Sequence, residues 1–385
     1  MKTKALLLVT VFIDIIGLGI IIPVLPFYVQ GFGVSDAVVT VLFAVYALLS
    51  FLSAPLLGSL SDRIGRRPVL VISIASSAIG WLVFASAKSV LVLFLGRIID
   101  GLAAGNITSA QSALADIAKT DKERTVNMGL FGALFGIGFI VGPAIGGALS
   151  HISTTAPFWF VGILATLNAL FGFFFLPETH HAKKAGAPLS FNPFTPIRDG
   201  LALPEMRKLF VTWFIFGVAL SLQQGSFSLY LARAFGMSAS AIGLIFGGIG
   251  VLILINQLVL LKRVWFRLGT PRALGQIMFV VFGVGMLLQA VPLVPALVIG
   301  LVATTFSQGT LRAVYGGMIA NAAPEKRGEY IGISASLMSL SMVLGPFIAT
   351  LFVARHPALS FFVAGILGLV AYMINIRWKK VAVSQ

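Results

Sequence analysis

The stretch of sequence that decides the fold is a short polar turn, and it reads Gly58-Ser59-Leu60-Ser61-Asp62-Arg63-Ile64-Gly65-Arg66-Arg67-Pro68. Apolar segments flank the turn at residues 39–59 and 69–87. A helix that crosses the hydrocarbon core of a membrane needs about 20 mostly apolar residues. The turn therefore joins two predicted membrane-spanning helices and places its charges at one membrane surface.

The same pattern continues along the whole chain and predicts twelve spans. The other ten are residues 5–27, 90–115, 127–150, 157–176, 207–232, 239–261, 273–292, 294–320, 329–354 and 357–377. Of the 385 residues 58% are hydrophobic and 10% are charged, whereas a soluble domain carries about 25% charged residues. This composition excludes a soluble enzyme and predicts an all-α, multi-pass membrane protein.

The excess of basic residues predicts the orientation. Of the 27 Lys and Arg residues, Lys88, Arg233 and Arg355 fall in one set of alternate loops, and Arg97 and Arg312 fall inside predicted spans. The remaining 22 lie on the side of the two termini. Because basic residues gather in cytoplasmic loops, both termini are predicted to be cytoplasmic. The formal charge of +15 therefore reports topology, and we expect the lipid bilayer and no nucleic acid as a partner.

An internal repeat divides the chain into two halves. Lys122-Glu123-Arg124 precedes Gly142-Pro143, and Glu325-Lys326-Arg327 precedes Gly345-Pro346 at an offset of 203 residues. We predict two pseudo-symmetric six-helix bundles at residues 1–177 and 207–385, joined by a cytoplasmic linker at 178–206. Duplicated bundles of this kind place a substrate site between the halves, near the middle of the membrane.

Four ionisable residues fall inside predicted spans: Asp14, Arg97, Asp100 and Arg312. Such residues are costly in lipid and usually face an interior cavity. Asp14 is the first candidate to carry a proton, although a buried acid can also serve packing alone. Arg97 and Asp100 are three residues apart and can pair on one helix face, for proton coupling or for structure. Arg312 is either an anion-binding cavity residue or a side chain that snorkels to the cytoplasmic surface.

Two further patterns suggest movement. In the turn after the second span, Gly58, Asp62, Arg63, Gly65, Arg66 and Arg67 form a predicted cytoplasmic latch. Charge-assisted bonds there can form in one conformation and break in another, although the positive charges can also act as plain membrane anchors. In the fifth span, Pro143 interrupts the helical hydrogen bonds among Gly138, Gly142, Gly146 and Gly147. These residues form a predicted hinge, although close helix packing alone also explains the small side chains.

Together these motifs resemble the major facilitator superfamily, and within it the twelve-helix drug:proton antiporters, especially the tetracycline efflux proteins. The turn at 58–70 is similar to the family signature GxLaDrxGrkxxl, and Asp14 to Pro26 fit the first-span pattern DxxGxGxxxPxxP. Arg97, Gly101 and Gly105 fit the fourth-span motif, whose arginine the resemblance ties to proton coupling. The segment from Gly138 to Gly147 fits the antiporter motif GxxxGPxxGG, which implies export.

The resemblance implies a secondary transporter in the bacterial inner membrane, but this sequence departs from the tetracycline exporters at three places. Neither the third span, at Ser77 to Trp81, nor the ninth, at 277–289, has the acid that those exporters carry. Asp100 stands where they have a small residue. The resemblance therefore predicts the transport class without naming the drug.

We therefore expect proton-coupled export of a small amphiphilic compound by alternating access, and a monomer without cofactor or metal. An enzyme is not expected, because all four histidines fall in predicted loops, and no GxxxxGK[ST] motif for ATP is present. A uniporter or importer of a sugar or organic anion, with Arg312 as the anion contact, is one alternative, and a membrane receptor without transport is another. Aromatic and polar side chains predicted to line the substrate cavity are Tyr46, Gln111, Trp213, Gln223, Gln224, Gln308, Arg312 and Tyr315.

Overall fold

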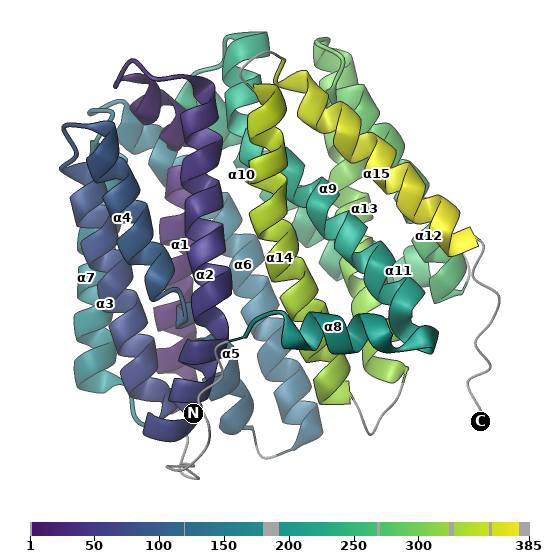
Figure 1. The fold of residues 1–385 in the computed structure, drawn as a ribbon, viewed down its shortest axis with the longest axis horizontal. Coiled ribbons are helices and arrows are strands. Elements are labelled where there is room, and N and C mark those ends of the chain that lie inside the picture. Colours follow the sequence, from purple (N-terminus) through teal and green to yellow (C-terminus); the bar gives the residue numbers. More distant parts are fainter. Residues whose placement is uncertain are drawn as a thin grey trace. The chain divides into compact units, whose positions relative to one another are not determined.

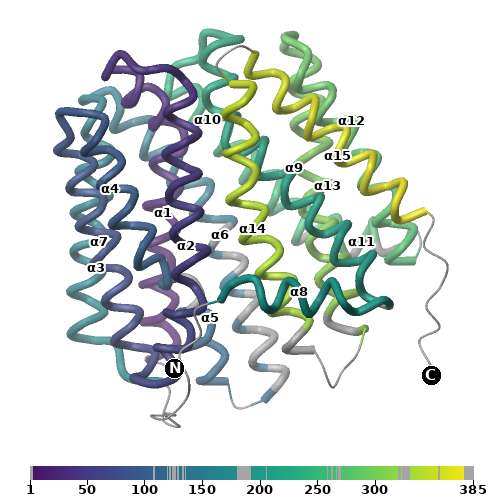
Figure 2. The backbone as a smooth tube through the Cα atoms, viewed as in Figure 1, coloured from purple at the N-terminus to yellow at the C-terminus, as the bar shows by residue number. Residues whose placement is uncertain are grey.

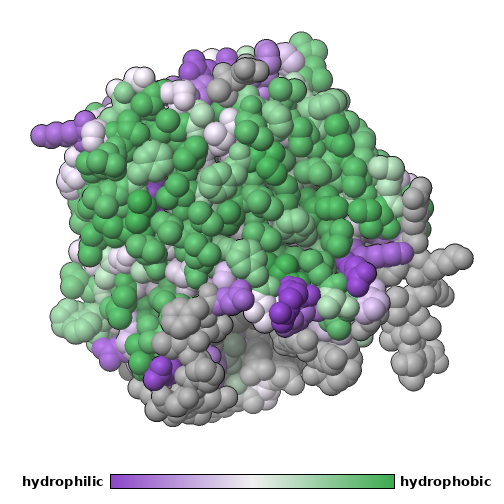
Figure 3. All heavy atoms as spheres, in the orientation of Figure 1, coloured by the Kyte–Doolittle hydropathy of each residue, from purple (hydrophilic) through white to green (hydrophobic). Residues whose placement is uncertain are grey.

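The computed structural model describes residues 2–118, 120–179, 192–267, 270–322, 327–353 and 356–376. These residues form helices and no strand (Figure 1). Nine of the described helices are long and apolar enough to cross a membrane, and two shorter apolar helices cover Gly136–Ser150 and Ala239–Ile255. The prediction of an all-α, multi-pass membrane protein is confirmed. On the face drawn in Figure 3, hydrophobic residues cover most of the helix surface and hydrophilic residues gather near helix ends.

The chain divides into two compact units. The first comprises Met1–Asn192 and Met237–Gly250, and the second comprises Pro193–Gly236 and Val251–Gln385. The first unit holds α1 (Lys2–Gln30), α2 (Asp36–Ile64), α3 (Arg66–Ala85), α4 (Val90–Leu102), α5 (Asn106–Asp116), α6 (Asp121–Ser150), α7 (Ala156–Phe175) and most of α10 (Ala239–Ile255). The second holds α8 (Thr195–Ala202), α9 (Pro204–Phe235), α11 (Leu261–Arg263), α12 (Pro271–Gln289), α13 (Val294–Asn321), α14 (Arg327–Val353) and α15 (Ala358–Ile376).

The helices of the two units pair in the same order, as the sequence repeat predicts. In the first unit α1 packs on α6 and α7, while α3 packs on α4 and α7 (Figure 2). In the second unit α9 packs on α14 and α15, while α12 packs on α13 and α15. Four pairings of the first unit therefore recur between the corresponding spans of the second unit.

Two segments differ from the predicted spans and linker. The predicted linker at 178–206 contains the helix α8, and its residues 180–191 lie outside the described residues. The predicted fourth span is split into α4 and α5 at Ala103–Gly105, so the expectation of one continuous helix is wrong. Close contact with α2 accompanies the break, because a Cβ on Gly105 would lie 2.9 Å from the Leu57 side chain. Ser53 donates a 3.2 Å hydrogen bond to the Gly101 carbonyl beside the break.

The glycines of the predicted hinge bring α6 into backbone contact with its neighbours. A Cβ on Gly142 would lie 2.8 Å from both the Gly19 Cα and the Ile16 carbonyl oxygen of α1. A Cβ on Gly147 would lie 3.0 Å from the Ser240 Cα of α10. Small residues at this spacing let two membrane helices approach along their backbones. Close packing is therefore one role of these residues, and movement at Pro143 stays a prediction.

We predict that Gly142→Ala destabilises the protein, because its neighbours are backbone atoms that cannot rotate away. Overpacking of this kind costs about 1–3 kcal/mol, and thermal unfolding of the purified protein, followed by tryptophan fluorescence, measures the loss. Gly248→Ala is the matched control, since a Cβ there meets no atom within 4 Å. Equal unfolding temperatures for Gly142→Ala and the wild type would show that this contact is not tight.

Candidate functional site

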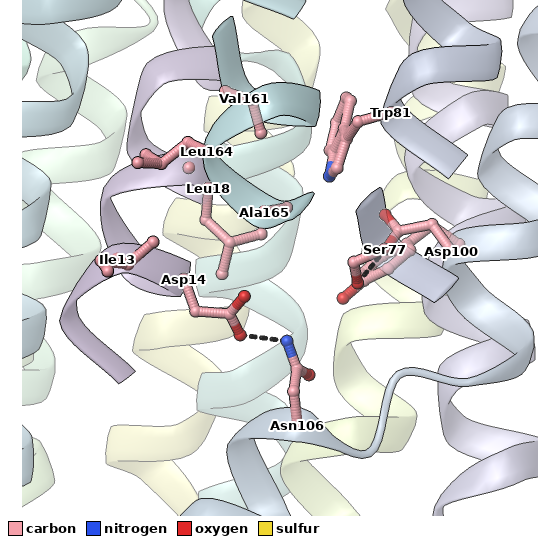
Figure 4. Close-up of a pocket in the computed structure, with 12 residues that line it drawn as sticks. Ile13, Asp14, Leu18, Ser77, Trp81, Asp100, Asn106, Val161, Leu164 and Ala165 are labelled. Carbon is pink, nitrogen blue, oxygen red and sulfur yellow. Dashed lines mark hydrogen bonds between the residues drawn. The ribbon is translucent and has the colours of Figure 1, made fainter. Parts of the chain in front are cut away.

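A small cavity inside the first unit brings the two intramembrane acids together (Figure 4). Its volume is about 20 Å³, which is room for about one water molecule. The residues that line it are Ile13, Asp14, Gly17, Leu18, Tyr46, Ser77, Trp81, Asp100, Asn106, Val161, Leu164 and Ala165. Asp14 and Asp100 face this space from opposite sides, each held by a different hydrogen-bond donor (Figure 4).

Asp14 is held by a neutral donor. The Asn106 side-chain amide donates a hydrogen bond to the Asp14 carboxylate. Asn106 is the first residue of α5, so the break after α4 sets the position of this amide. No ion pair with Asp14 is found among the described residues. Sequence reasoning missed Asn106, because residues 90–115 were predicted to form one continuous span without a helix break.

Asp100 is held by a cation. Arg97 and Asp100 are 6% and 2% exposed, and the Arg97 Nη1 atom lies 3.2 Å from Asp100 Oδ2. Ser77 donates a 2.6 Å hydrogen bond to the other carboxylate oxygen. The predicted pairing of Arg97 with Asp100 on one helix face is therefore present. A buried carboxylate with a cation and a hydroxyl donor is satisfied locally, whereas Asp14 has only an amide.

Aromatic rings surround the Arg97 guanidinium on α4. Its Cζ atom lies 3.5 Å from the centre of the Trp81 ring, 5.0 Å from that of Phe84 and 5.7 Å from that of Tyr46. A cation over an aromatic face is stabilised by the electrons of the ring, and more strongly when water is excluded. Trp81 lies in the third span where the tetracycline exporters were expected to carry an acid. In this chain the third span supplies the Trp81 ring, which stabilises the Arg97 cation of the fourth span, and it supplies no negative charge.

Three of the residues predicted to line a substrate cavity pack inside the second unit, and their role there stays a prediction. Tyr315 is fully buried, accepts a 2.8 Å hydrogen bond from Asn375 and stacks on Trp213 with ring centres 5.9 Å apart. The indole of Trp213 donates to the Ser334 carbonyl. The side-chain amide of Gln223 donates a 2.9 Å hydrogen bond to Gln289 inside the unit. Sequence alone could not tell which face of each helix these polar atoms occupy.

The other predicted cavity residues remain accessible or line the acid cavity. Tyr46 lines the acid cavity itself. Gln224 and Arg312 are exposed, while Gln111 and Gln308 are half-buried. Of the predicted cavity residues in the second unit, those that stay accessible therefore lie on α9 and α13.

The predicted latch is a connected ion-pair cluster centred on Arg66. The Arg66 Nη1 atom lies 2.7 Å from Asp62 Oδ1, and its Nε atom lies 2.9 Å from Asp116 Oδ2 at the end of α5. Ser61 accepts a further 2.9 Å hydrogen bond from Nη1. Arg66 thus links the turn between α2 and α3 to the end of α5. Asp116 was missed from the sequence, since its distance in the chain gave no sign of contact.

Gly65 and Glu178 complete the turn. Gly65 has φ of +115°, a conformation that L side chains rarely adopt, and a Cβ there would collide with the Glu178 carboxylate. Glu178 accepts a 2.9 Å hydrogen bond from the Arg66 backbone N–H, at the start of α3. A carboxylate at a helix N-terminus is favourable because the free N–H groups carry partial positive charge. Glu178 was also missed, although it lies only two residues after the sixth predicted span.

The remaining latch residues have weaker ties. Arg67 donates a hydrogen bond to the Phe173 carbonyl, and its guanidinium lies 5.9 Å from the Phe173 ring centre. Arg63 is half-buried, and a Cβ on Gly58 meets no atom within 4 Å. The cluster therefore depends on Arg66 and on Gly65.

Comparisons with known proteins find one matching family and relatives that span nearly the whole chain. The Major Facilitator Superfamily model matches residues 7–260 and 209–384. The Tetracycline resistance protein, class C, of Escherichia coli is 31% identical over 391 residues, which cover 97% of this chain and 96% of that protein. The Multidrug resistance protein 1 of Bacillus subtilis (strain 168) is 26% identical over 386 residues, which cover 98% of this chain and 96% of that protein. The crystal structure of the human organic anion transporter TETRAN has a TM-score of 0.75 at 21% identity, covering 97% of this chain and 99% of that one.

We predict that the Arg97 and Asp100 pair is energetically coupled. Arg97→Gln leaves a buried carboxylate without its cation and is expected to cost about 3–5 kcal/mol, whereas Arg97→Gln with Asp100→Asn recovers most of that loss. Thermal unfolding of the single and double variants measures the coupling. Arg198→Gln is the control, because the pair of Arg198 with Asp199 is exposed. A double variant as unstable as the sum of its single variants would rule out the coupling.

Proposed function

We propose that this chain, which belongs to the Major Facilitator Superfamily, exports a small amphiphilic compound in exchange for protons. The observation that carries the proposal is the pair of acids around the water-sized cavity of the first unit. The relatives named for tetracycline and multidrug resistance support a drug-type substrate. We assign the protein to a bacterial inner membrane with both termini in the cytoplasm, as its distribution of basic residues favours.

Asp14 is the proposed proton carrier. It faces the cavity with a neutral amide as its hydrogen-bond donor, so its charge has no buried cation to stabilise it. Protonation removes that charge, and deprotonation restores a carboxylate that accepts from Asn106. Asp100 is the second acid, and its ion pair with Arg97 holds it as a carboxylate until that pair separates. In this mechanism the protein binds either a proton at Asp14 or the substrate, but not both at once. Proton import is therefore coupled to substrate export.

A proton gradient is a sufficient energy source for this exchange. Each elementary charge that crosses the membrane releases about 2.3 kcal/mol per 100 mV. That energy supports a concentration ratio of about fiftyfold. One proton per substrate molecule therefore drives useful export without ATP.

Alternating access is proposed to use the latch and the hinge. The Arg66 cluster with Asp62 and Asp116 holds one conformation through charge-assisted bonds, which open when the helix ends move apart. Inside α6 of the same unit, Pro143 removes a hydrogen bond and leaves a point of bending. In this proposal the two sequence halves rock against each other and expose the site to each side in turn.

We predict that Asp14→Asn abolishes pH-driven transport. Inverted vesicles with an acidic interior, prepared with the wild type, should accumulate a transported compound, chosen from a panel that includes tetracycline, and a protonophore should stop the accumulation. Asp14→Asn cannot exchange the proton and should retain only exchange of substrate for substrate. Asp199→Asn changes an exposed acid of α8 and should behave as the wild type. The proposal would be contradicted if the protonophore left accumulation by the wild type unchanged, or if Asp14→Asn kept full pH-driven transport.

We also predict that Arg66→Gln slows turnover at least tenfold while changing the KM little, because it weakens a conformational step and not the substrate site. The initial rate of pH-driven uptake over a range of substrate concentrations separates these two quantities. Arg198→Gln again provides the control at an exposed arginine. A normal turnover rate for Arg66→Gln would remove the latch from the mechanism.

A further inference from the structure

The second unit carries an accessible arginine on one of its spans. Arg312 lies nine residues before the end of α13, about 14 Å along the helix axis. Its side chain is exposed, and Gln308, four residues earlier on the same face, is half-buried. Gly316, one turn later, is exposed, and a Cβ there would meet no atom within 4 Å. These three positions form an open stripe, which we call the Arg312 stripe.

No acid of the second unit balances this charge inside the membrane. The acidic residues of the unit are Asp199, Glu205, Glu325 and Glu329, and all of them lie in the linker or at the end of an apolar span. Arg312 has no ion pair or hydrogen bond with another described residue of its unit. By contrast, Arg97 of the first unit has both an acid and aromatic rings. An unbalanced cation at this depth needs water or an anion beside it.

The exposed face around Arg312 does not have the character of a lipid-facing surface. Helices with a lipid-facing side expose large apolar residues, as α7 does with Leu167 and α15 with Phe362. The first part of α13 also does so, at Ile299. From residue 303 to residue 319, however, the exposed positions of α13 are Arg312 and Gly316 alone, among residues that the structure describes.

The same holds for α9. Between residues 209 and 231 of that helix the one exposed side chain is Gln224. A mid-span amide or guanidinium that faces hydrocarbon would cost several kcal/mol, about as much as an unsatisfied polar group in lipid. The accessible faces of α9 and of the later part of α13 are therefore in contact with water or with a polar ligand.

We propose that the Arg312 stripe is an anion-recognition site and that the exported compound carries a delocalised anionic group, such as a carboxylate or a sulfonate, on an apolar body. The planar guanidinium presents paired N–H donors that match two oxygens of such a group, and Gln308 supplies a further amide one helical turn away. The inference rests on the proposed export function and adds the chemical class of its substrate. The substrate then brings its own negative charge to the second unit, while the proton binds at the acids of the first.

Binding of two matched probes to the purified protein in lipid nanodiscs tests the ligand class. The probes are anilinonaphthalene sulfonate and phenylnaphthylamine, which share a ring system and differ by the sulfonate; the signal from empty nanodiscs is subtracted. The wild type should bind the sulfonate at least tenfold more tightly. Arg312→Gln should remove this preference by weakening sulfonate binding tenfold or more, while Arg312→Lys keeps part of it. Arg233→Gln, at an exposed arginine near the end of α9, should leave the preference intact.

Equal affinity of the wild type for the two probes, or unchanged sulfonate binding by Arg312→Gln, would overturn the anion site. Asp14→Asn separates this result from the proton-coupling proposal, because it should keep the sulfonate preference at fixed pH even though it loses pH-driven transport. Loss of proton coupling with an intact Arg312-dependent preference would therefore refute the first proposal and leave this one standing.

Accessibility of the stripe is tested without a ligand. The chain contains no cysteine, so a single cysteine can be introduced directly. A membrane-impermeant maleimide should label Arg312→Cys in intact membranes and should leave Ile299→Cys, on the apolar exposed face of the same helix, unlabelled. Labelling of Ile299→Cys alone, or of neither position, would show that Arg312 does not face water and would overturn the site.

Discussion

The cost of an ionised group in hydrocarbon is the constraint on which the rest of this structure depends. A charge inside the membrane must form an ion pair, accept or donate hydrogen bonds, or be in contact with water. The chain meets this requirement in three different ways. Arg97 and Asp100 form an ion pair beside aromatic rings. Asp14 accepts a hydrogen bond from the amide of Asn106. Arg312 stays accessible on the Arg312 stripe. The first arrangement balances its own charges, although the Nε and Nη2 atoms of Arg97 have no hydrogen-bond partner among the described residues, whereas the other two leave a charge that a proton or a ligand can balance.

The two units share their helix pairing but not their chemistry. The fourth span is broken between α4 and α5, while its counterpart α13 is one continuous helix. The break gives the first unit an amide donor at Asn106 and frees the Gly101 carbonyl for Ser53. The second unit has no acid inside its spans and keeps its buried amides, such as Gln223 with Gln289, paired within its core. The two units thus differ in their intramembrane charges: the first has two acids around a cavity, and the second has an accessible arginine on α13.

Sequence reasoning found the elements of this fold because hydrophobic length and charge are local properties. The long apolar segments were enough to predict that the chain is helical and crosses the membrane many times, whereas the assignment of residues 237–250 to the second half differs from the observed units. The Arg97 and Asp100 pair was also predictable, because three residues of separation fix a shared helix face. The sequence could likewise indicate Gly65, since a glycine between two helices marks a tight turn.

What sequence reasoning missed depends on contacts between distant segments. Asn106 meets Asp14 across 92 positions of the chain, and Arg66 meets Asp116 across 50. Glu178 reaches the start of α3 across 112 positions. No periodicity reports such distances. The packing of Tyr315 and Trp213 could not be predicted for a related reason, because an aromatic residue with a polar atom fits a binding site and a packed core equally well until its helix face is known.

In the proposed mechanism Asp14 takes up and releases the transported proton. Infrared difference spectroscopy of the protein in lipid, recorded as the pH is lowered, measures this event at the carboxyl group itself. If Asp14 carries the proton, a protonated carboxyl band appears on acidification, shrinks when a transported compound binds, and is missing in Asp14→Asn. A band that persists unchanged in Asp14→Asn, or no carboxyl band over the pH range in which transport occurs, would contradict this mechanism.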